Sequence, residues 1–167
     1  VDLSNYRIWL ISNGGTWPES EIVLSGTLLN DDVFVVMNSA ADFVNLTSID
    51  DLSSGSLNFN GDDAVGLSKK IGEIWTLIDA VGVSGADPGT GWAVAGITDA
   101  TADRVLTRKN TISAPNTDWD ASRGANTESS EWIVATGGTN SDASGFGSHS
   151  YSGGSSPSFV SGYNNLT

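Results

Sequence analysis

The residues of this chain best suited to chemistry are carboxylates that come in pairs. Asp31 and Asp32, Asp50 and Asp51, and Asp62 and Asp63 are adjacent, while Asp118 and Asp120 are separated by one residue. Two facing carboxylates are what a glycosidase needs. Each pair, however, lies where a turn is expected, and aspartate favours turns because its side chain hydrogen-bonds the nearby backbone. We therefore expect turns at these positions, with a glycosidase as the alternative.

Calcium is the second chemistry that the acidic residues suit. Asp118 and Asp120 lie in a loop that also contains Asn116, Ser122 and Asn126, and Ca²⁺ prefers such oxygen ligands. The spacing does not match the EF-hand loop, which has Gly and a bidentate Glu at fixed positions. Asp118 and Asp120 are thus candidate Ca²⁺ ligands, although nothing in the sequence requires a cofactor. The alternative is that Asx turns alone stabilise this loop.

Six tryptophans are the third feature with binding chemistry. Three lie in strand-like sequence and are expected in the core: Trp9, Trp75 and Trp132. The other three lie in loops rich in Gly, Pro and Asp: Trp17, Trp92 and Trp119. Exposed aromatic rings stack on sugars, so these three are candidate residues of a carbohydrate-binding module. The alternative is that they fold back and cover the core.

The sequence lacks the residue patterns of common catalytic sites. Nucleophilic catalysis needs a base beside the nucleophile, and the single histidine, His149, lies in Ser/Gly-rich sequence. Gly-x-Ser-x-Gly, His-Glu-x-x-His and Walker motifs are absent. We predict that the chain is not an enzyme and that His149 has a structural or surface role. A hydrolase fragment is the remaining catalytic alternative.

Charge and composition exclude several partners. The 167 residues include 7 basic and 20 acidic side chains, which gives a net charge of −13. That charge repels phosphate backbones and anionic lipid headgroups, so we expect no nucleic acid as partner. No apolar run approaches the roughly 20 residues of a membrane-spanning helix, so no membrane insertion is expected. Cysteine is absent, which excludes disulfides and thiolate zinc sites.

Short β-rich runs separated by turn residues predict an all-β fold of about eight strands. The expected strands are 6–11, 21–24, 33–37, 57–59, 64–67, 73–81, 104–109 and 131–135. Run 33–37 is continuously apolar, as in a strand buried on both faces. The only expected helix is one short turn at 40–44, with Ser39 as its N-cap. Residues 112–130 are expected to form a long loop.

Several segments resemble the landmarks of lamin tail domains in their bacterial extracellular form. The most recognisable is GDDAVGL at 61–67. In the same order as in that family, the chain also contains VDLSNY at 1–6, LSGTL at 24–28 with DVFVV at 32–36, IDAVG at 78–82, LTRK at 106–109, SEW at 130–132 and GSH at 147–149. The resemblance covers residues 1–151 and implies an immunoglobulin-like β-sandwich.

The chain departs from the family pattern at both ends. A strand pair that usually precedes the first landmark is missing, which would leave an unpaired sheet edge. Residues 152–157 read as a Ser/Gly-rich linker, and 158–167 are similar to the first strand of a fibronectin type III-like module. We therefore expect one domain at 1–151, followed by a linker and the start of another module at 152–167.

These features lead to an expectation for function. We expect a non-catalytic structural, adhesion or interaction module of a larger secreted or cell-surface bacterial protein. The resemblance implies this location, and protein neighbours in the same assembly are the expected partners, through a sheet edge completed by a neighbouring strand or chain. One alternative is a carbohydrate-binding module that takes polysaccharide at the loop tryptophans. The other is an accessory domain of an extracellular nuclease or phosphatase.

Overall fold

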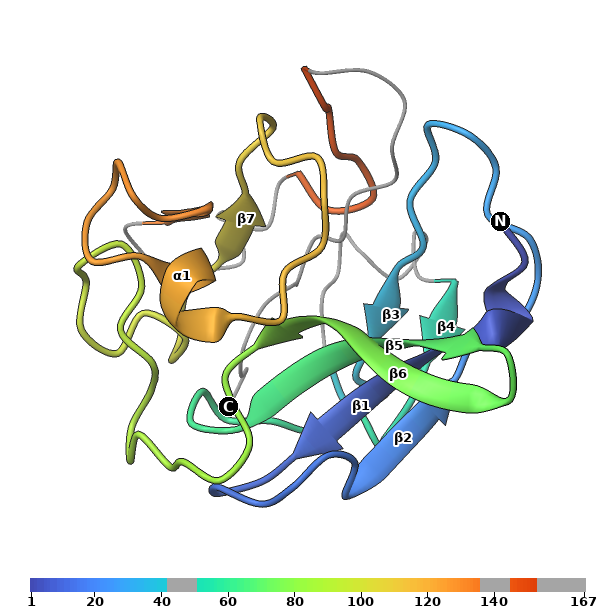
Figure 1. The fold of residues 1–167 in the computed structure, drawn as a ribbon, viewed down its shortest axis with the longest axis horizontal. Helices are drawn as coiled ribbons and strands as arrows, with labels where there is room; N and C mark the ends of the chain where they lie inside the picture. The colour runs from blue at the N-terminus through green and yellow to red at the C-terminus, as the bar shows by residue number, and fades with distance from the viewer. Residues whose placement is uncertain (42–50, 136–144, 153–167) are drawn as a thin grey trace.

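The computed structural model describes residues 1–41, 51–135 and 145–152, which form eight strands, one short α-helix and one 3-10 turn (Figure 1). The elements are η1 (Leu3–Asn5), β1 (Tyr6–Ile11), β2 (Ser20–Val23), β3 (Val36–Met37), β4 (Leu52–Ser53), β5 (Ala64–Ile71), β6 (Ile74–Val81), β7 (Leu106–Arg108), α1 (Trp119–Arg123) and β8 (Trp132–Val134). The prediction of an all-β fold with about eight strands and at most one short helix is confirmed.

The main sheet has four antiparallel strands in the order β2-β1-β5-β6. The two long strands, β5 and β6, form a hairpin whose turn is Gly72 and Glu73, with Gly72 at φ +63°. A register shift between Leu67 and Ser68 marks a β-bulge in this pair, and a bulge increases the local twist of a strand. Two smaller sheets pair β3 with β4 in parallel and β7 with β8 antiparallel.

One face of the main sheet is covered by the first apolar cluster. Ile8 and Leu10 of β1 and Ile22 of β2 are each at most 6% exposed, and they pack with side chains of β3 and β4. Burying one such side chain is worth about 1.5–3 kcal/mol, so this cluster is a main source of stability. The layering of β3 and β4 across the sheet is compatible with an immunoglobulin-like sandwich.

The apolar run at 33–37 has both of its faces against apolar clusters, as the sequence predicted. Phe34 and Val36 pack into the first cluster, whereas Val35 and Met37 form a second one with Val33. Only Val36–Met37 is a strand, however, and it pairs in parallel with Leu52–Ser53, a strand that the sequence pattern did not reveal. The expected strand at 57–59 is irregular in structure.

The third cluster lies at the other end of the molecule, around β7, β8 and α1. Its largest members are Trp119 and Trp132, at 3% and 0% exposure, and Val81 connects it to the end of β6. The α-helix begins after Asp118, whose carboxylate accepts a hydrogen bond from the Ala121 N–H at 3.0 Å. This helix lies inside the loop that we expected at 112–130.

Two predicted features extend into residues outside the described ranges. Of the helix expected at 40–44, residues 42–44 lie outside the described residues. Of the linker and second module expected at 152–167, only Ser152 is described. The turn expected at 61–63 is present. Gly61 has φ +111°, and the Asp63 carboxylate accepts hydrogen bonds from the N–H groups of Asn13 (3.1 Å) and Asn60 (3.3 Å).

Candidate binding face on the four-stranded sheet

The second face of the main sheet carries most of the aromatic and charged side chains of its strands. Side chains alternate between the two faces of a strand, so Arg7 and Trp9 lie opposite the face that Ile8 and Leu10 bury. The register places Glu21 beside Trp9 on this second face. We call it the tryptophan face, defined by Arg7, Trp9, Trp17, Glu21, Trp75 and Leu77.

Gly66 shows how the other members reach the tryptophan face. It pairs with Trp9, and a Cβ atom added to it would lie 2.5 Å from Leu77 Cδ1 and 3.3 Å from Trp17 Cη2. Leu77 and Trp17 therefore both lie over Gly66. The absence of a side chain at this position lets them pack closely on the sheet.

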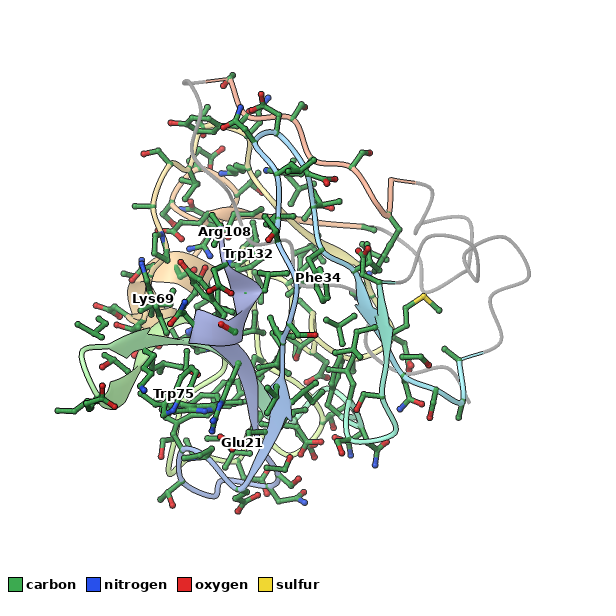
Figure 2. All side chains as sticks on the ribbon, turned by 90° about the vertical axis from the view of Figure 1, so that its right-hand side faces the viewer. Glu21, Phe34, Lys69, Trp75, Arg108 and Trp132 are labelled. Carbon is green, nitrogen blue, oxygen red and sulfur yellow. The ribbon has the colours of Figure 1, made fainter. Side chains whose placement is uncertain are left out.

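Arg7 links the charged and aromatic parts of this face. Its guanidinium lies 4.0 Å from the centre of the Trp75 ring and forms an ion pair with the Glu21 carboxylate. Figure 2 shows Trp75 and Glu21 close together beside the β1 and β2 strands. The Arg7 and Glu21 side chains are 25% and 38% exposed, so solvent reaches both. A cation–π contact of this kind is worth about 0.5–1 kcal/mol at an exposed site.

Two hydrogen-bond donors on the tryptophan face have no partner among the described residues. They are Nε of Arg7 and Nε1 of Trp9, both buried. Leaving a buried donor unsatisfied costs about 1–3 kcal/mol, and such groups in a native protein call for an explanation. The two residues are adjacent on the same side of β1, so two unused donors belong to one patch.

The three loop tryptophans expected to bind sugar are not brought together. Trp119 is 3% exposed and lies in the third cluster, where Trp92 meets it edge to face with ring centres 6.3 Å apart. Trp119 therefore cannot offer its ring to a sugar in this structure, which corrects the expectation for that residue. Trp92 is half-buried against the same cluster, whereas Trp17 lies on the tryptophan face.

The tryptophans expected in the core also divide between two places. Trp9 and Trp132 are buried, as predicted. Trp75 is only half-buried and lies under Arg7, outside the three clusters. Strand periodicity could have shown that Arg7 and Trp9 share one side of their strand, and that Trp75 and Leu77 share one side of theirs, because each pair is two residues apart within a predicted strand. It could not have shown that the two pairs lie on the same face of one sheet.

The candidate calcium ligands have structural partners instead. Asp118 caps α1, and Asp120 pairs with Arg123 at 2.8 Å on the surface. In the described part of the chain, no group of three or more His, Cys, Asp or Glu side chains is placed to hold a metal ion. Asp118 thus bonds the nearby backbone, as in the Asx-turn alternative, whereas Asp120 forms an ion pair and no Asx turn.

A buried ion network connects the main sheet to the third cluster. The Arg108 guanidinium donates to both oxygens of Asp79, at 2.7 and 2.6 Å, and to the Glu131 carboxylate. Arg108 and Asp79 are each 2% exposed. The guanidinium also lies 4.8 Å from the centre of the Trp132 ring. Strands β6, β7 and the residue preceding β8 therefore meet at one arginine.

Neighbouring polar groups surround this network. Glu131 accepts hydrogen bonds from Asn116 Nδ2 at 2.9 Å and from the Ser122 hydroxyl at 3.0 Å. Burial raises the pKa of Asp79 above its ordinary value, although hydrogen bonds from Arg108 oppose that effect. Burial also acts to raise the pKa of Glu131, but the bonds from Asn116, Arg108 and Ser122 together hold that pKa below its ordinary value. Both carboxylates of the network are hydrogen-bonded, and the buried Nε of Arg108 is its one donor without a partner among the described residues, so the network suits a structural role.

His149 is half-buried near the end of the described residues. Burial lowers the pKa of its imidazole, and its Nε2 atom has no hydrogen-bond partner within those residues. Its structural or surface role stays a prediction.

The comparisons with known proteins gave no match. No protein-family model matches the chain, and the searches of curated proteins and of solved structures each found no match. The resemblance to lamin tail domains therefore stays a prediction. Among the helices of the described residues, none is long and apolar enough to cross a membrane.

Proposed function

We propose that this chain is a non-catalytic structural module of an extracellular or cell-surface protein, and that it assembles with a second copy of itself through the outer edge of β6. The expected location rests on the sequence resemblance. The observation that carries the assembly is the open edge of an eight-residue strand. Exposed edge strands offer unpaired N–H and C=O groups to another chain.

Within the described part of the chain, this edge is covered at one end only. There, the Ala80 N–H donates to the Asn116 carbonyl at 3.2 Å, and the Asn116 N–H donates to the Asp79 carboxylate at 3.1 Å. Over 74–78, β6 makes no backbone hydrogen bond to any described residue other than those of β5. The hairpin projects from the body of the molecule (Figure 2), which leaves room for a partner strand.

The residues of this edge are suited to antiparallel pairing with themselves. Segment 74–78 reads Ile-Trp-Thr-Leu-Ile and contains no charge, proline or glycine. In a symmetric pair centred on Thr76, Ile74 would face Ile78 and Trp75 would face Leu77 of the second copy. Threonine, aromatic and β-branched cross-strand pairs each contribute about 0.2–1 kcal/mol. Within 74–78 no like charges would meet across the new pair, and the first like charges in this register are Glu73 and Asp79, one position beyond each end of the segment.

The second strand at the edge of the sheet is less suited to pairing. Strand β2 has four residues and carries Glu21, and natural proteins protect sheet edges with short strands and charges. Each edge strand carries one strongly exposed apolar side chain, and the exposure of Ile74 on β6 (71%) exceeds that of Val23 on β2 (59%).

Sedimentation equilibrium of the full chain tests this proposal. We expect a dimer that becomes tighter as salt rises from about 0.15 to about 0.5 M, because salt screens the repulsion between two chains of charge −13. Thr76→Lys should give a monomer, since it places two like charges at the centre of the pair. Thr98→Lys adds the same charge on an exposed turn that is not part of β6, so it is the matched control and should leave the dimer intact. A wild-type chain that stays monomeric at high salt would refute the proposal.

A further inference from the structure

We propose that the tryptophan face is a binding site for a neutral saccharide. The site uses the face of the main sheet, whereas the dimer proposed above uses the outer edge of β6, and the two surfaces share Trp75 and Leu77. It is also distinct from the loop site expected from the sequence, since only Trp17 belongs to both.

The unused donors are the first support. Nε of Arg7 and Nε1 of Trp9 are buried without a partner among the described residues, and Trp9 as a whole is 8% exposed. The two side chains leave the same side of β1 two residues apart. A ligand with several acceptor oxygens would satisfy both N–H groups. Sugar hydroxyls and ring oxygens are acceptors of this kind.

The surrounding groups complete the donor and acceptor set that a saccharide needs. The Glu21 carboxylate accepts hydrogen bonds only, and 38% of its side chain is exposed. Trp17 and Trp75 are half-buried, so part of each ring is open to solvent. Aromatic rings combine a large apolar surface with defined geometry, which suits the C–H face of a pyranose. Such a mixture of apolar area and few polar groups is typical of ligand sites.

The charges of the tryptophan face and of the whole chain favour a neutral sugar over an anionic one. The Arg7 guanidinium is already paired with Glu21, so the patch has no free positive charge for a carboxylate or phosphate. The chain as a whole carries −13, and this field repels anionic ligands. A neutral saccharide neither competes for the ion pair nor meets that repulsion.

Binding requires the Arg7 side chain to move. Both unused donors are shielded from water in the free protein, while the Arg7 side chain is 25% exposed. We infer that Arg7 turns from Trp75 toward the sugar and that its Nε–H then donates to a sugar oxygen. This change alters the stacking on Trp75, so binding should be visible in the signals of that indole.

NMR titration of the ¹⁵N-labelled full chain tests the site directly. The six indole N–H signals are assigned with single Trp→Phe variants, and the chain is titrated with cellohexaose, mannohexaose and hexagalacturonate. We expect a neutral hexaose at about 1 mM to shift the indole signals of Trp9 and Trp75 and the Nε–H signal of Arg7. Hexagalacturonate should shift none of them.

Matched variants separate the site from general effects on folding. Trp9→Phe removes one unused donor on the face and should weaken binding about tenfold, the loss typical of one buried hydrogen bond. Trp119→Phe removes an equally unpartnered indole N–H in the third cluster and should leave the affinity unchanged. Arg7→Lys keeps the charge opposite Glu21 but lacks the Nε–H group, and it should also weaken binding.

Three results would overturn the inference. The first is that no neutral hexaose shifts the three signals at millimolar concentration. The second is that hexagalacturonate binds there and the neutral sugars do not. The third is that Trp119→Phe weakens binding as much as Trp9→Phe. None of them bears on the dimer, whose test is the sedimentation of Thr76→Lys.

Discussion

Replacing Arg108 by methionine should destabilise the protein more than any substitution of a surface charge. The change removes the only cation among the described residues that pairs with Asp79, and Asp79 is 2% exposed. Glu131, whose side chain is 20% exposed, loses the same partner. Breaking a buried pair by removing one partner costs about 3–5 kcal/mol, because the other charge stays buried. Methionine fills a similar volume, so the loss of stability would result from the unpaired buried charge of Asp79 and not from a cavity.

Urea unfolding followed by tryptophan fluorescence measures this loss. Domains of this kind have a total stability of about 5–15 kcal/mol, so the change removes a large fraction of it. With an m-value of about 2 kcal/mol/M, a loss of 4 kcal/mol moves the midpoint by roughly 2 M. The matched control is Arg123→Met. It breaks an exposed pair with Asp120, which should be worth at most about 1 kcal/mol.

The pH dependence of the Arg108→Met variant gives a second, independent check. Burial already raises the pKa of Asp79, and Arg108 opposes that rise. Without Arg108 the carboxyl should bind a proton at still higher pH, and the neutral form carries no buried charge. The deficit relative to the wild type should therefore shrink as the pH falls. A deficit below about 1 kcal/mol at neutral pH, or one that grows toward acid pH, would refute a buried, charged network.

Three further predictions concern a turn, a helix cap and the histidine. Gly61→Ala should lower the free energy of unfolding in urea more than Gly26→Ala does. An added Cβ at Gly61 would lie 2.8 Å from the Ala102 Cα, whereas at Gly26 it meets nothing within 4 Å. Both glycines have positive φ, so equal losses of stability would exclude the steric cause. Asp118→Ala should lower the free energy of unfolding by about 1 kcal/mol, because it removes the cap of α1. The loss should be the same in Ca²⁺ and in EDTA. A loss seen only in Ca²⁺ would instead support Asp118 as a Ca²⁺ ligand. Burial lowers the pKa of His149 from 6.5, so its contribution to stability is present above that value and is lost as the pH falls toward the lower, folded-state pKa. His149→Gln should make the melting temperature depend less on pH between about pH 7.5 and about pH 5. An unchanged pH dependence would show that another group causes the loss of stability.

Much of the fold could be predicted from the sequence because its strands follow simple patterns. β1 agrees with the expected bounds, and the other long strands differ by a few residues at their ends. Parallel pairing of β3 with β4 could not be predicted, because two-residue strands carry no periodicity. The helix at 119–123 was missed because its five residues are too few for a helical pattern, although Asp118 is an ordinary N-cap residue.

The site was harder to predict than the fold. Loop position suggested that Trp119 is exposed, but loop sequences do not show which side chains turn inward, and Trp119 packs with Trp132 in the third cluster. The tryptophan face depends on register between strands that are far apart in sequence. Glu21 reaches Arg7 only because β2 pairs with β1 in one alignment, and no local pattern specifies that alignment.

The position of β1 at the centre of the main sheet affects how the chain folds during synthesis. Its second partner, β5, ends at Ile71, which is 60 residues after the end of β1 at Ile11. At about 5–20 residues per second, the ribosome needs several seconds to deliver that partner. During this time a β1–β2 hairpin would present the bare side of β1 to other nascent chains. Until β5 arrives, this strand therefore has one side on which a chaperone could prevent pairing with other nascent chains.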